Sequence, residues 1–405
     1  MSEKSKIASL KPARFVKMVA QRISAVKAAP DTDVPPLESY QANRIAAALH
    51  PKAQFLKVKE IVAHSPDFKT IVLEADREKG TDALAWFSAG QYLSVALAFD
   101  GMCLTRPYSL ASAPLDAKNG EYRLGIKRVK DGLASNYLLD RLAVGDTLTA
   151  SAPLGQFTYE PLRDAETVIG IAGGSGITPF RSFARAIADG TEKDMRLVLL
   201  YGSRTLADAV YADEIAALAE KCDRIKLVNV LSEEEKEGCE SGFISADIIK
   251  KYAPENEAYS VFMCGPQAMY SFMDKELPKL GLRRKFIRRE LFGEYFGPAK
   301  EADYPKDVQE SYKLTVLQSG SETVVDCRSD ASILRAMEAA GISAPADCRS
   351  GECGWCRSQL LSGDVYVPAS VDGRRLADLD YGYIHPCCTF PLSDCEIDVP
   401  PMPYV

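Results

Sequence analysis

The distribution of cysteine constrains the fold of this chain more than any other feature. Seven of the eleven cysteines lie beyond residue 326, and the other four (Cys103, Cys222, Cys239 and Cys264) are scattered. Disulfide scaffolds are typical of short secreted chains, whereas this chain has 405 residues and starts without the apolar core of an export signal. The clustering therefore predicts a metal or iron–sulfur site near the carboxyl terminus, in a cytoplasmic protein.

The spacing of these cysteines distinguishes between the two kinds of site. Cys348, Cys353 and Cys356 follow the pattern C-x4-C-x2-C, and Cys387 and Cys388 follow about thirty residues later. This is the spacing of plant-type [2Fe–2S] domains, whereas zinc sites favour two short C-x2-C pairs. We therefore expect a [2Fe–2S] cluster, with the fourth ligand open between the two adjacent cysteines.

Hydrophobic patterning divides the rest of the chain. Short alternating runs separated by Gly and Asp turns fill residues 54–160, which predicts a small antiparallel barrel. Over 166–290 apolar runs alternate with helical patterns, which predicts βαβ units and a parallel sheet. The segment 293–311 is rich in Gly, Pro and charge and predicts a linker. The expected fold class is a multidomain protein with α/β and β parts.

The first thirty residues differ in charge from the rest of the chain. They carry seven Lys and Arg residues against one acidic residue, although the net charge of the chain is −7. Helical spacing of apolar residues predicts a basic amphipathic helix over 12–27, and a second short helix is expected over 37–48. The first helix would dock on an acidic partner or an anionic membrane, or else pack on its own protein.

Two classes of protein are excluded by the composition. The acidic net charge argues against nucleic-acid binding by the chain as a whole. The sequence contains no run of 18 apolar residues, so no membrane span is expected.

A glycine-rich turn points to a nucleotide. Gly173, Gly174 and Gly176, followed by Thr178, lie between a predicted strand and a predicted helix. Such glycines let a pyrophosphate approach the backbone, and the helix N-terminus favours its negative charge. The turn is weak evidence alone, because it is not the usual G-x-G-x-x-G. Two further segments end strands at the same predicted sheet edge: Ser203-Arg204 and Cys264-Gly265-Pro266.

Upstream of the sheet, Arg106-Pro107-Tyr108-Ser109 follows a strand of the predicted barrel. Together these segments resemble the ferredoxin–NADP reductase-like superfamily, and the added carboxyl-terminal ferredoxin resembles the phthalate dioxygenase reductase type. The resemblance covers roughly residues 52–403. Together with the patterning, it predicts a division of the chain into 52–162 (flavin-binding barrel), 163–292 (NAD(P)-binding domain), 293–311 (linker) and 312–405 (β-grasp [2Fe–2S] ferredoxin domain). Residues 1–51, the basic helical extension, lie outside the resemblance.

The resemblance also implies roles for the matching residues. Arg106 would pair with a flavin phosphate, Tyr108 would stack on the flavin, and Ser109 would lie near flavin N5. Gly132 and Ser135 match the second flavin segment. The remaining cofactor-binding positions would be Pro107, Gly173, Gly174, Gly176, Thr178, Ser203, Arg204, Cys264, Gly265, Pro266 and Phe292. The candidate catalytic residues are Ser109, Cys264 and Glu290. Because the last family cysteine precedes a proline by four, the cluster ligands would be Cys348, Cys353, Cys356 and Cys387.

The function that the resemblance implies is electron transfer. Electrons from NAD(P)H would pass through flavin and the cluster, then singly to a protein acceptor such as an oxygenase or hydroxylase. FAD is favoured over FMN and NADH over NADPH, although Arg204 would suit a 2′-phosphate. One alternative is the electron-input subunit of a stable complex, docked through the basic N-terminal helix. The other is a redox-sensing module without turnover.

Overall fold

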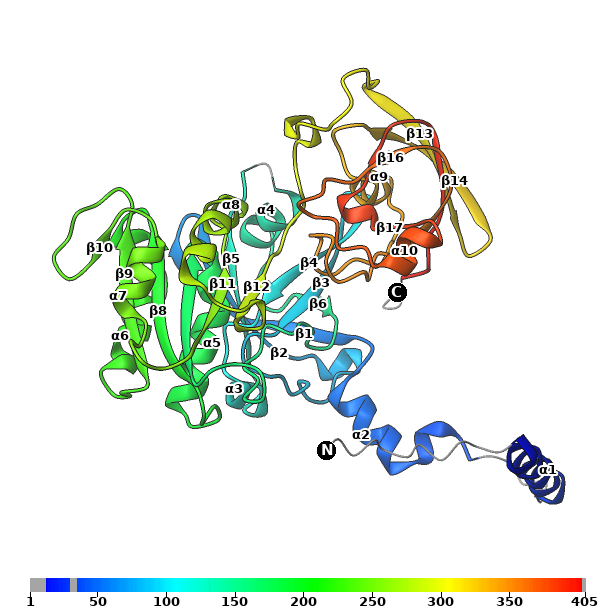
Figure 1. Ribbon diagram of the computed structural model, residues 1–405, viewed down its shortest axis with the longest axis horizontal. Coiled ribbons are helices and arrows are strands. Elements are labelled where there is room, and N and C mark those ends of the chain that lie inside the picture. The colour runs from blue at the N-terminus through cyan, green and yellow to red at the C-terminus, as the bar shows by residue number, and fades with distance from the viewer. Residues whose placement is uncertain (1–11, 30–34, 131, 403–405) are drawn as a thin grey trace, which may run out of the picture. The chain divides into compact units, whose positions relative to one another are not determined.

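The computed structural model describes residues 12–29, 35–130 and 132–402 (Figure 1). Two compact units divide the chain, Met1–Ala47 and Ala48–Val405. The first unit contains α1 (Pro12–Ala28) and most of α2 (Gln41–Leu49). Both predicted helices are present, although a single 3-10 turn precedes α2 and delays its start. Several apolar side chains of α1, among them Val19 and Ile23, are exposed.

The second unit begins with an antiparallel sheet in the order β4-β3-β6-β1-β2-β5. A bridge between Leu110 and Leu124 joins the end of β4 to β5 and so closes the sheet toward a barrel, as predicted. Leu56, Ile71 and Leu93 lie in its core. The elements of this part are β1 (Gln54–Ser65), β2 (Phe68–Ala75), β3 (Tyr92–Phe99), β4 (Met102–Ser109), α3 (Pro114–Lys118), β5 (Tyr122–Lys127), α4 (Leu133–Asp140) and β6 (Thr147–Ala150).

A parallel sheet follows in the order β10-β9-β8-β7-β11-β12, with the βαβ alternation that the sequence predicts. Its strands are β7 (Thr167–Gly173), β8 (Arg196–Ser203), β9 (Ile225–Leu231), β10 (Glu240–Ser241), β11 (Tyr259–Cys264) and β12 (Ile287–Glu290). Its helices are α5 (Ile177–Ala188), α6 (Ala212–Ala219), α7 (Ala246–Tyr252) and α8 (Gln267–Glu276).

Strand β12 extends the sheet beyond the predicted strands. Its sequence, Ile-Arg-Arg-Glu, contains no apolar run. Arg288 can nevertheless be buried in the strand, because it pairs with Asp164 at 2.5 Å. The pairing of β11 with β12 sets Glu290 opposite Cys264. A strand without an apolar run thus carries one of the predicted site residues.

The carboxyl-terminal part is a mixed sheet with helix α9 against it, which agrees with the expected β-grasp. The sheet order is β14-β13-β19-β15-β17, and β13 and β19 are parallel. Ile333, Leu334 and Met337 of α9 fill its core. The elements are β13 (Ser311–Gln318), β14 (Ser321–Arg328), α9 (Ile333–Ala339), β15 (Ser358–Ser362), β16 (Val365–Tyr366), α10 (Leu376–Asp380), β17 (Tyr383–Ile384), β18 (Phe390–Pro391) and β19 (Cys395–Asp398).

Short 3-10 helices complete the second unit alongside α3 to α10. They are η2 (Arg77–Lys79), η3 (Gly174–Gly176), η4 (Leu206–Asp208), η5 (Leu277–Leu280), η6 (Arg284–Phe286), η7 (Pro298–Lys300) and η8 (Pro386–Cys388); η1 (Leu37–Ser39) lies in the first unit. Across the residues described, none of the helices has the length and apolar character needed to cross a membrane.

The ferredoxin part docks directly on the barrel. The hydroxyl of Thr105 on β4 donates a hydrogen bond to the carbonyl oxygen of Ala346 at 2.6 Å, and that of Ser94 on β3 donates to the same oxygen at 3.2 Å. The backbone N–H of Gly293 donates to the carbonyl of Cys348 at 3.4 Å. These bonds hold the cysteine loop beside strands β3 and β4, where Figure 1 places the carboxyl-terminal part.

Candidate functional site

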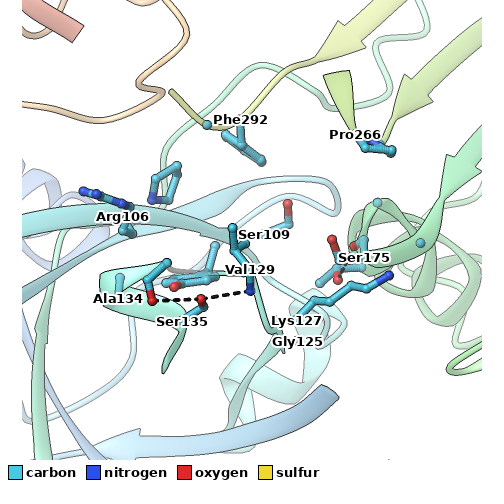
Figure 2. A pocket seen from close by; sticks show the side chains of 18 of the residues that line it. Arg106, Ser109, Gly125, Lys127, Val129, Ala134, Ser135, Ser175, Pro266 and Phe292 are labelled. Carbon is cyan, nitrogen blue, oxygen red and sulfur yellow. Dashed lines mark hydrogen bonds between the residues drawn. The ribbon is translucent and has the colours of Figure 1, made fainter. Parts of the chain in front are cut away.

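A cavity of about 480 Å³ lies where the barrel, the parallel sheet and the segment after β12 meet (Figure 2). The predicted flavin and nicotinamide residues line it, with the exception of Ser203 and Arg204. Those that line it are Arg106, Pro107, Tyr108, Ser109, Gly132, Ser135, Gly173, Gly174, Gly176, Thr178, Cys264, Gly265, Pro266, Glu290 and Phe292. Segments that lie far apart in the sequence are thus brought to one place.

Strand ends explain why these residues meet. Parallel strands end at the same edge of a sheet, and ligands of such sheets bind there. Strands β7, β11 and β12 end at Gly173, Cys264 and Glu290, which all line the cavity. The end of β4, carrying Arg106 to Ser109, supplies the opposite wall.

The glycine turn has room for a phosphate but not for side chains. A Cβ at Gly176 would lie 2.0 Å from the carbonyl oxygen of Cys264, and Gly174 has φ +53°. The turn leads directly into α5, whose first N–H groups have no partner within the helix and carry partial positive charge. The hydroxyl of Thr178 donates to the carbonyl of Ser175 at 2.8 Å and holds the turn. The turn therefore fits a pyrophosphate.

The sequence reasoning missed Lys127, Ser175 and Gly125, which also line the cavity. The Nζ of Lys127 would lie 3.1 Å from a Cβ built on Gly174, so this ammonium group lies over the glycine turn. Figure 2 shows Lys127 extending from β5 toward Ser175. The signal available in the sequence was weak, because a lysine at the end of a strand is usually a solvent-exposed residue.

Ser109 and Glu290 join the two walls of the cavity. The Ser109 hydroxyl donates to Oε2 of Glu290 at 3.2 Å, and both residues are buried. Burial raises the pKa of Glu290 well above its usual range, and the negative charge of Glu352 raises it further, while the Ser109 hydrogen bond opposes the shift. Burial likewise raises the pKa of the neighbouring Cys264 thiol. Both groups therefore favour their protonated forms.

Arg106 belongs to a buried ion network as well as to the cavity. Its guanidinium lies 3.3 Å from Glu294 and 3.4 Å from Glu338. Arg349, in the cysteine loop and fully buried, pairs with the same two carboxylates and lies 2.6 Å from Glu338. Burial opposes ionisation of Glu294, but Arg349 and Arg106 outweigh it and hold the pKa of that carboxyl below its usual range. Two cations and two anions thus connect the barrel, the linker, α9 and the cysteine loop.

This network includes Glu294 of the segment 293–311 that was predicted to be a linker. The Tyr295 ring packs against Phe390 of the ferredoxin part at 6.1 Å between centroids. The Gly, Pro and charge content of the segment predicted a linker but gave no indication of these contacts. Its fixed contacts depend on charges that come from three other segments.

The cysteine loop presents paired sulfur atoms. The Sγ atoms of Cys356 and Cys387 lie 3.4 Å apart. The Sγ of Cys348 accepts hydrogen bonds from the backbone N–H groups of Cys353 at 3.4 Å and Ser350 at 3.5 Å. Backbone N–H groups aimed at cysteine sulfur are one of the means by which proteins set the potential of an iron–sulfur cluster. The loop therefore fits a [2Fe–2S] cluster.

Cys388 has a different environment from Cys387. Its thiol donates to the carbonyl oxygen of His385 at 3.5 Å. Within residues 12–402, apart from the few positions left undescribed, no three His, Cys, Asp or Glu side chains gather around one point that would hold a single metal ion. A [2Fe–2S] cluster needs no such group, because its four cysteines are shared between two irons.

Ser203 and Arg204 lie outside the cavity, at the end of β8. Arg204 is exposed and pairs with Asp208 at 3.3 Å. A second carboxylate is close, since Glu234 accepts the backbone N–H of Leu206 at 2.7 Å. This corner of the sheet is therefore less positive than Arg204 alone would make it.

Comparison with known proteins identifies the family. The oxidoreductase FAD-binding domain matches residues 55–159, the oxidoreductase NAD-binding domain 171–275, and the 2Fe-2S iron-sulfur cluster binding domain 316–392. The ferredoxin reductase component of 3-ketosteroid-9-alpha-monooxygenase from Rhodococcus rhodochrous is 30% identical over 85% of this chain and 95% of its own length. The chain belongs to the iron–sulfur flavoprotein reductases.

A second curated relative and a solved structure agree with the assignment of this chain to the reductase family. The glycine betaine monooxygenase reductase from Chromohalobacter salexigens is 25% identical, over 84% of this chain and 93% of its own length. The solved structure of phthalate dioxygenase reductase is 25% identical with a TM-score of 0.62, over 86% of this chain and 98% of its own. The predicted fold class, the three cofactor domains and their order are confirmed.

Proposed function

We propose that this reductase transfers electrons from NADH, through FAD and its [2Fe–2S] cluster, to a protein acceptor that is an oxygenase. The observation that carries the proposal is the joining of all three sites in one compact unit. The β4 end, the carboxyl edge of the parallel sheet and the cysteine loop lie next to one another. Relatives named as reductase components of monooxygenases support the choice of acceptor.

The proposal assigns the flavin to the barrel side of the cavity. A bound flavin accepts hydride and releases electrons one at a time, which a one-electron cluster requires. Arg106 would bind a flavin phosphate while it remains paired with Glu294 and Glu338, and the Tyr108 ring would support the isoalloxazine. Gly132 lets the backbone turn into α4, and the Ser135 hydroxyl holds that turn by accepting the N–H of Val129 at 3.1 Å.

The nicotinamide nucleotide is assigned to the sheet side. Gly173, Gly174, Gly176 and Thr178 would hold its pyrophosphate, with Cys264-Gly265-Pro266 leaving space for its ring. NADH is preferred over NADPH because Asp208 pairs with Arg204, and carboxylates at this position favour a ribose hydroxyl over a phosphate. The ratio of kcat/KM for NADH and NADPH measures this preference directly.

Ser109 and Glu290 are assigned a proton-holding role. Burial raises the pKa of the Glu290 carboxyl, so this group favours its protonated form and would exchange its proton with the bound cofactor. Ser109 and Glu290 both line the cavity, and the Ser109 hydroxyl, which donates to Oε2 of Glu290, would orient that carboxyl. Cys264, beside them, contributes a neutral thiol wall.

The cluster is assigned to Cys348, Cys353, Cys356 and Cys387. All cysteines of the chain are unpaired, as a reducing compartment permits, and this supports a cytoplasmic location. Rapid reduction of cytochrome c by the purified chain with NADH tests the whole proposal. If neither cytochrome c nor ferricyanide is reduced, the redox-sensing alternative replaces it.

Helix α1 is proposed as a docking arm for the acceptor. Between residues 12 and 28 the helix has four basic residues and no acidic one, and Val16, Val19, Ile23 and Val26 are exposed. An acidic, partly apolar face of a redox partner would match such a surface. Deletion of residues 1–47 should weaken capture of the acceptor at least tenfold while cytochrome c reduction is retained. Unchanged capture would exclude the docking arm.

A further inference from the structure

The ferredoxin part contributes an arginine to the flavin cavity. Arg335 lies in the first turn of α9, where its N–H donates to the Ser332 hydroxyl at 3.3 Å. Ile333 and Leu334 occupy the ferredoxin core, so Arg335 points away from it; the side chain is exposed and lines the cavity. Its guanidinium carbon lies 5.6 Å from the centroid of the Phe296 ring.

Arg335 differs from the other cavity arginines in its partners. Arg106 is committed to Glu294 and Glu338, and Arg128 pairs with Asp67 and Asp140. Arg335, in contrast, forms no ion pair within 4.0 Å in the part of the chain that the structure describes, although its charge lowers the pKa of Glu294 and of Asp330. An arginine on a ligand cavity without an acidic partner is available to an anion of the ligand.

The position of Arg335 selects the anion. Lys127 lies over the glycine turn at the sheet side of the cavity. Arg335, by contrast, lies on the side of Arg106, since α9 packs on β4 and both arginines lower the pKa of Glu294. The flavin phosphate is the anion assigned to that side.

We propose that Arg335 binds the phosphate of the flavin nucleotide, so that the ferredoxin domain completes the flavin site of the barrel. This rests on the proposed function, because it takes flavin as the occupant of the barrel side. The guanidinium presents a planar pair of donors to phosphate oxygens. If Arg335 binds the flavin phosphate, flavin binding and docking of the ferredoxin domain stabilise each other by thermodynamic linkage.

Flavins with and without phosphate test the proposal. The full-length chain, stripped of flavin with its cluster intact, is titrated with FAD, FMN and riboflavin by fluorescence quenching. Arg335→Gln should raise the Kd for FAD and FMN about tenfold and leave that for riboflavin within about twofold, because only the nucleotides carry phosphate. Arg335→Lys should recover part of the loss.

Arg328→Gln is the matched control. Arg328 is an exposed arginine of the same domain, paired with Glu310 and Asp330 and absent from the cavity, and its loss should leave all three Kd values unchanged. An equal loss for riboflavin and FAD, or no loss for any flavin, overturns the proposal. If the phosphate effect is present but cytochrome c is not reduced by NADH, the inference stands and the proposed function fails.

Discussion

At the scale of single residues, Glu290 depends on a neighbour from another domain. Its strand belongs to the parallel sheet, but its hydrogen-bond donor, Ser109, ends a strand of the barrel. Burial raises the pKa of Glu290, and the Ser109 hydrogen bond opposes part of this shift. A carboxyl of ordinary pKa would be ionised at neutral pH and would hold no proton for the cofactor.

Glu290→Gln should weaken the pH dependence of the free energy of unfolding. The folded-state pKa of Glu290 is raised, so the folded protein binds a proton that the unfolded chain has lost. The free energy of unfolding of the wild type therefore falls as pH rises from the usual value of 4.5 through the raised pKa. In Glu290→Gln this fall should be smaller, measured as Tm against pH.

The same variant tests the proton-holding role. Reduction of the flavin by NADH should slow about tenfold or more in Glu290→Gln and lose its decline at high pH, with flavin content unchanged. Stopped-flow absorbance follows this step alone. A wild-type rate and pH profile in Glu290→Gln would show that Glu290 shapes the pocket without holding a proton.

At the scale of elements, the cysteine loop shows how a local motif is built. Gly351 has φ +84°, and a Cβ there would lie 2.1 Å from the carbonyl of Val371, so the turn after Cys348 requires glycine. The turn brings backbone N–H groups onto Cys348 sulfur. Three of the predicted ligands lie within residues 348–356, and the fourth comes from η8 (Pro386–Cys388), which is distant in the sequence. Helix η8 sets Cys387 rather than Cys388 beside Cys356.

Replacing Cys387 and Cys388 one at a time distinguishes the cysteine that binds the cluster from the one that does not. Cys387→Ser should lose the visible absorbance and most of the iron of the cluster, and with them cytochrome c reduction, while flavin reduction by NADH is spared. Cys388→Ser should retain the iron and the activity, because its thiol faces the carbonyl of His385. The reverse result, measured as iron per chain, would exchange the two assignments.

At the scale of the whole molecule, the network of Arg106, Glu294, Glu338 and Arg349 links the domains. Arg349 is fully buried and its charge is balanced by carboxylates from the linker and α9. Removal of one partner of a buried ion pair leaves an uncompensated charge, which costs about 3–5 kcal/mol. The network therefore holds the cysteine loop against the end of β4, which carries Arg106.

Glu338→Gln should destabilise this docking. Electron transfer from flavin to cluster should slow several-fold, because its rate depends on the separation that docking sets, while reduction of flavin by NADH keeps its wild-type rate. Stopped-flow at separate flavin and cluster wavelengths resolves the two steps. Glu310→Gln, which removes an exposed pair with Arg328 in the same domain, serves as control and should change neither. Equal slowing of both steps would contradict the docking role.

Much of this reductase could be predicted from its sequence, for identifiable reasons. Barrel and βαβ strands carry apolar periodicity, whereas β12 carries Arg288 and Arg289 instead of an apolar run, and both are held by ion pairs that form only in the tertiary structure. The residues predicted from motifs line one cavity, except Ser203 and Arg204, because most of these motifs are contiguous turns at strand ends that face the same place. Lys127 and Arg335 have no such local pattern.

The sequence by itself determined the order of the domains, the cysteine spacing and the glycine turn, because each depends on residues close together in the chain. Only the tertiary structure decided how the domains share their sites. It placed Glu290 on Ser109, set the Cys387 sulfur beside that of Cys356, and brought Arg335 to the cavity. These contacts join segments far apart in sequence, and their energies arise from burial and paired charge that exist only after folding.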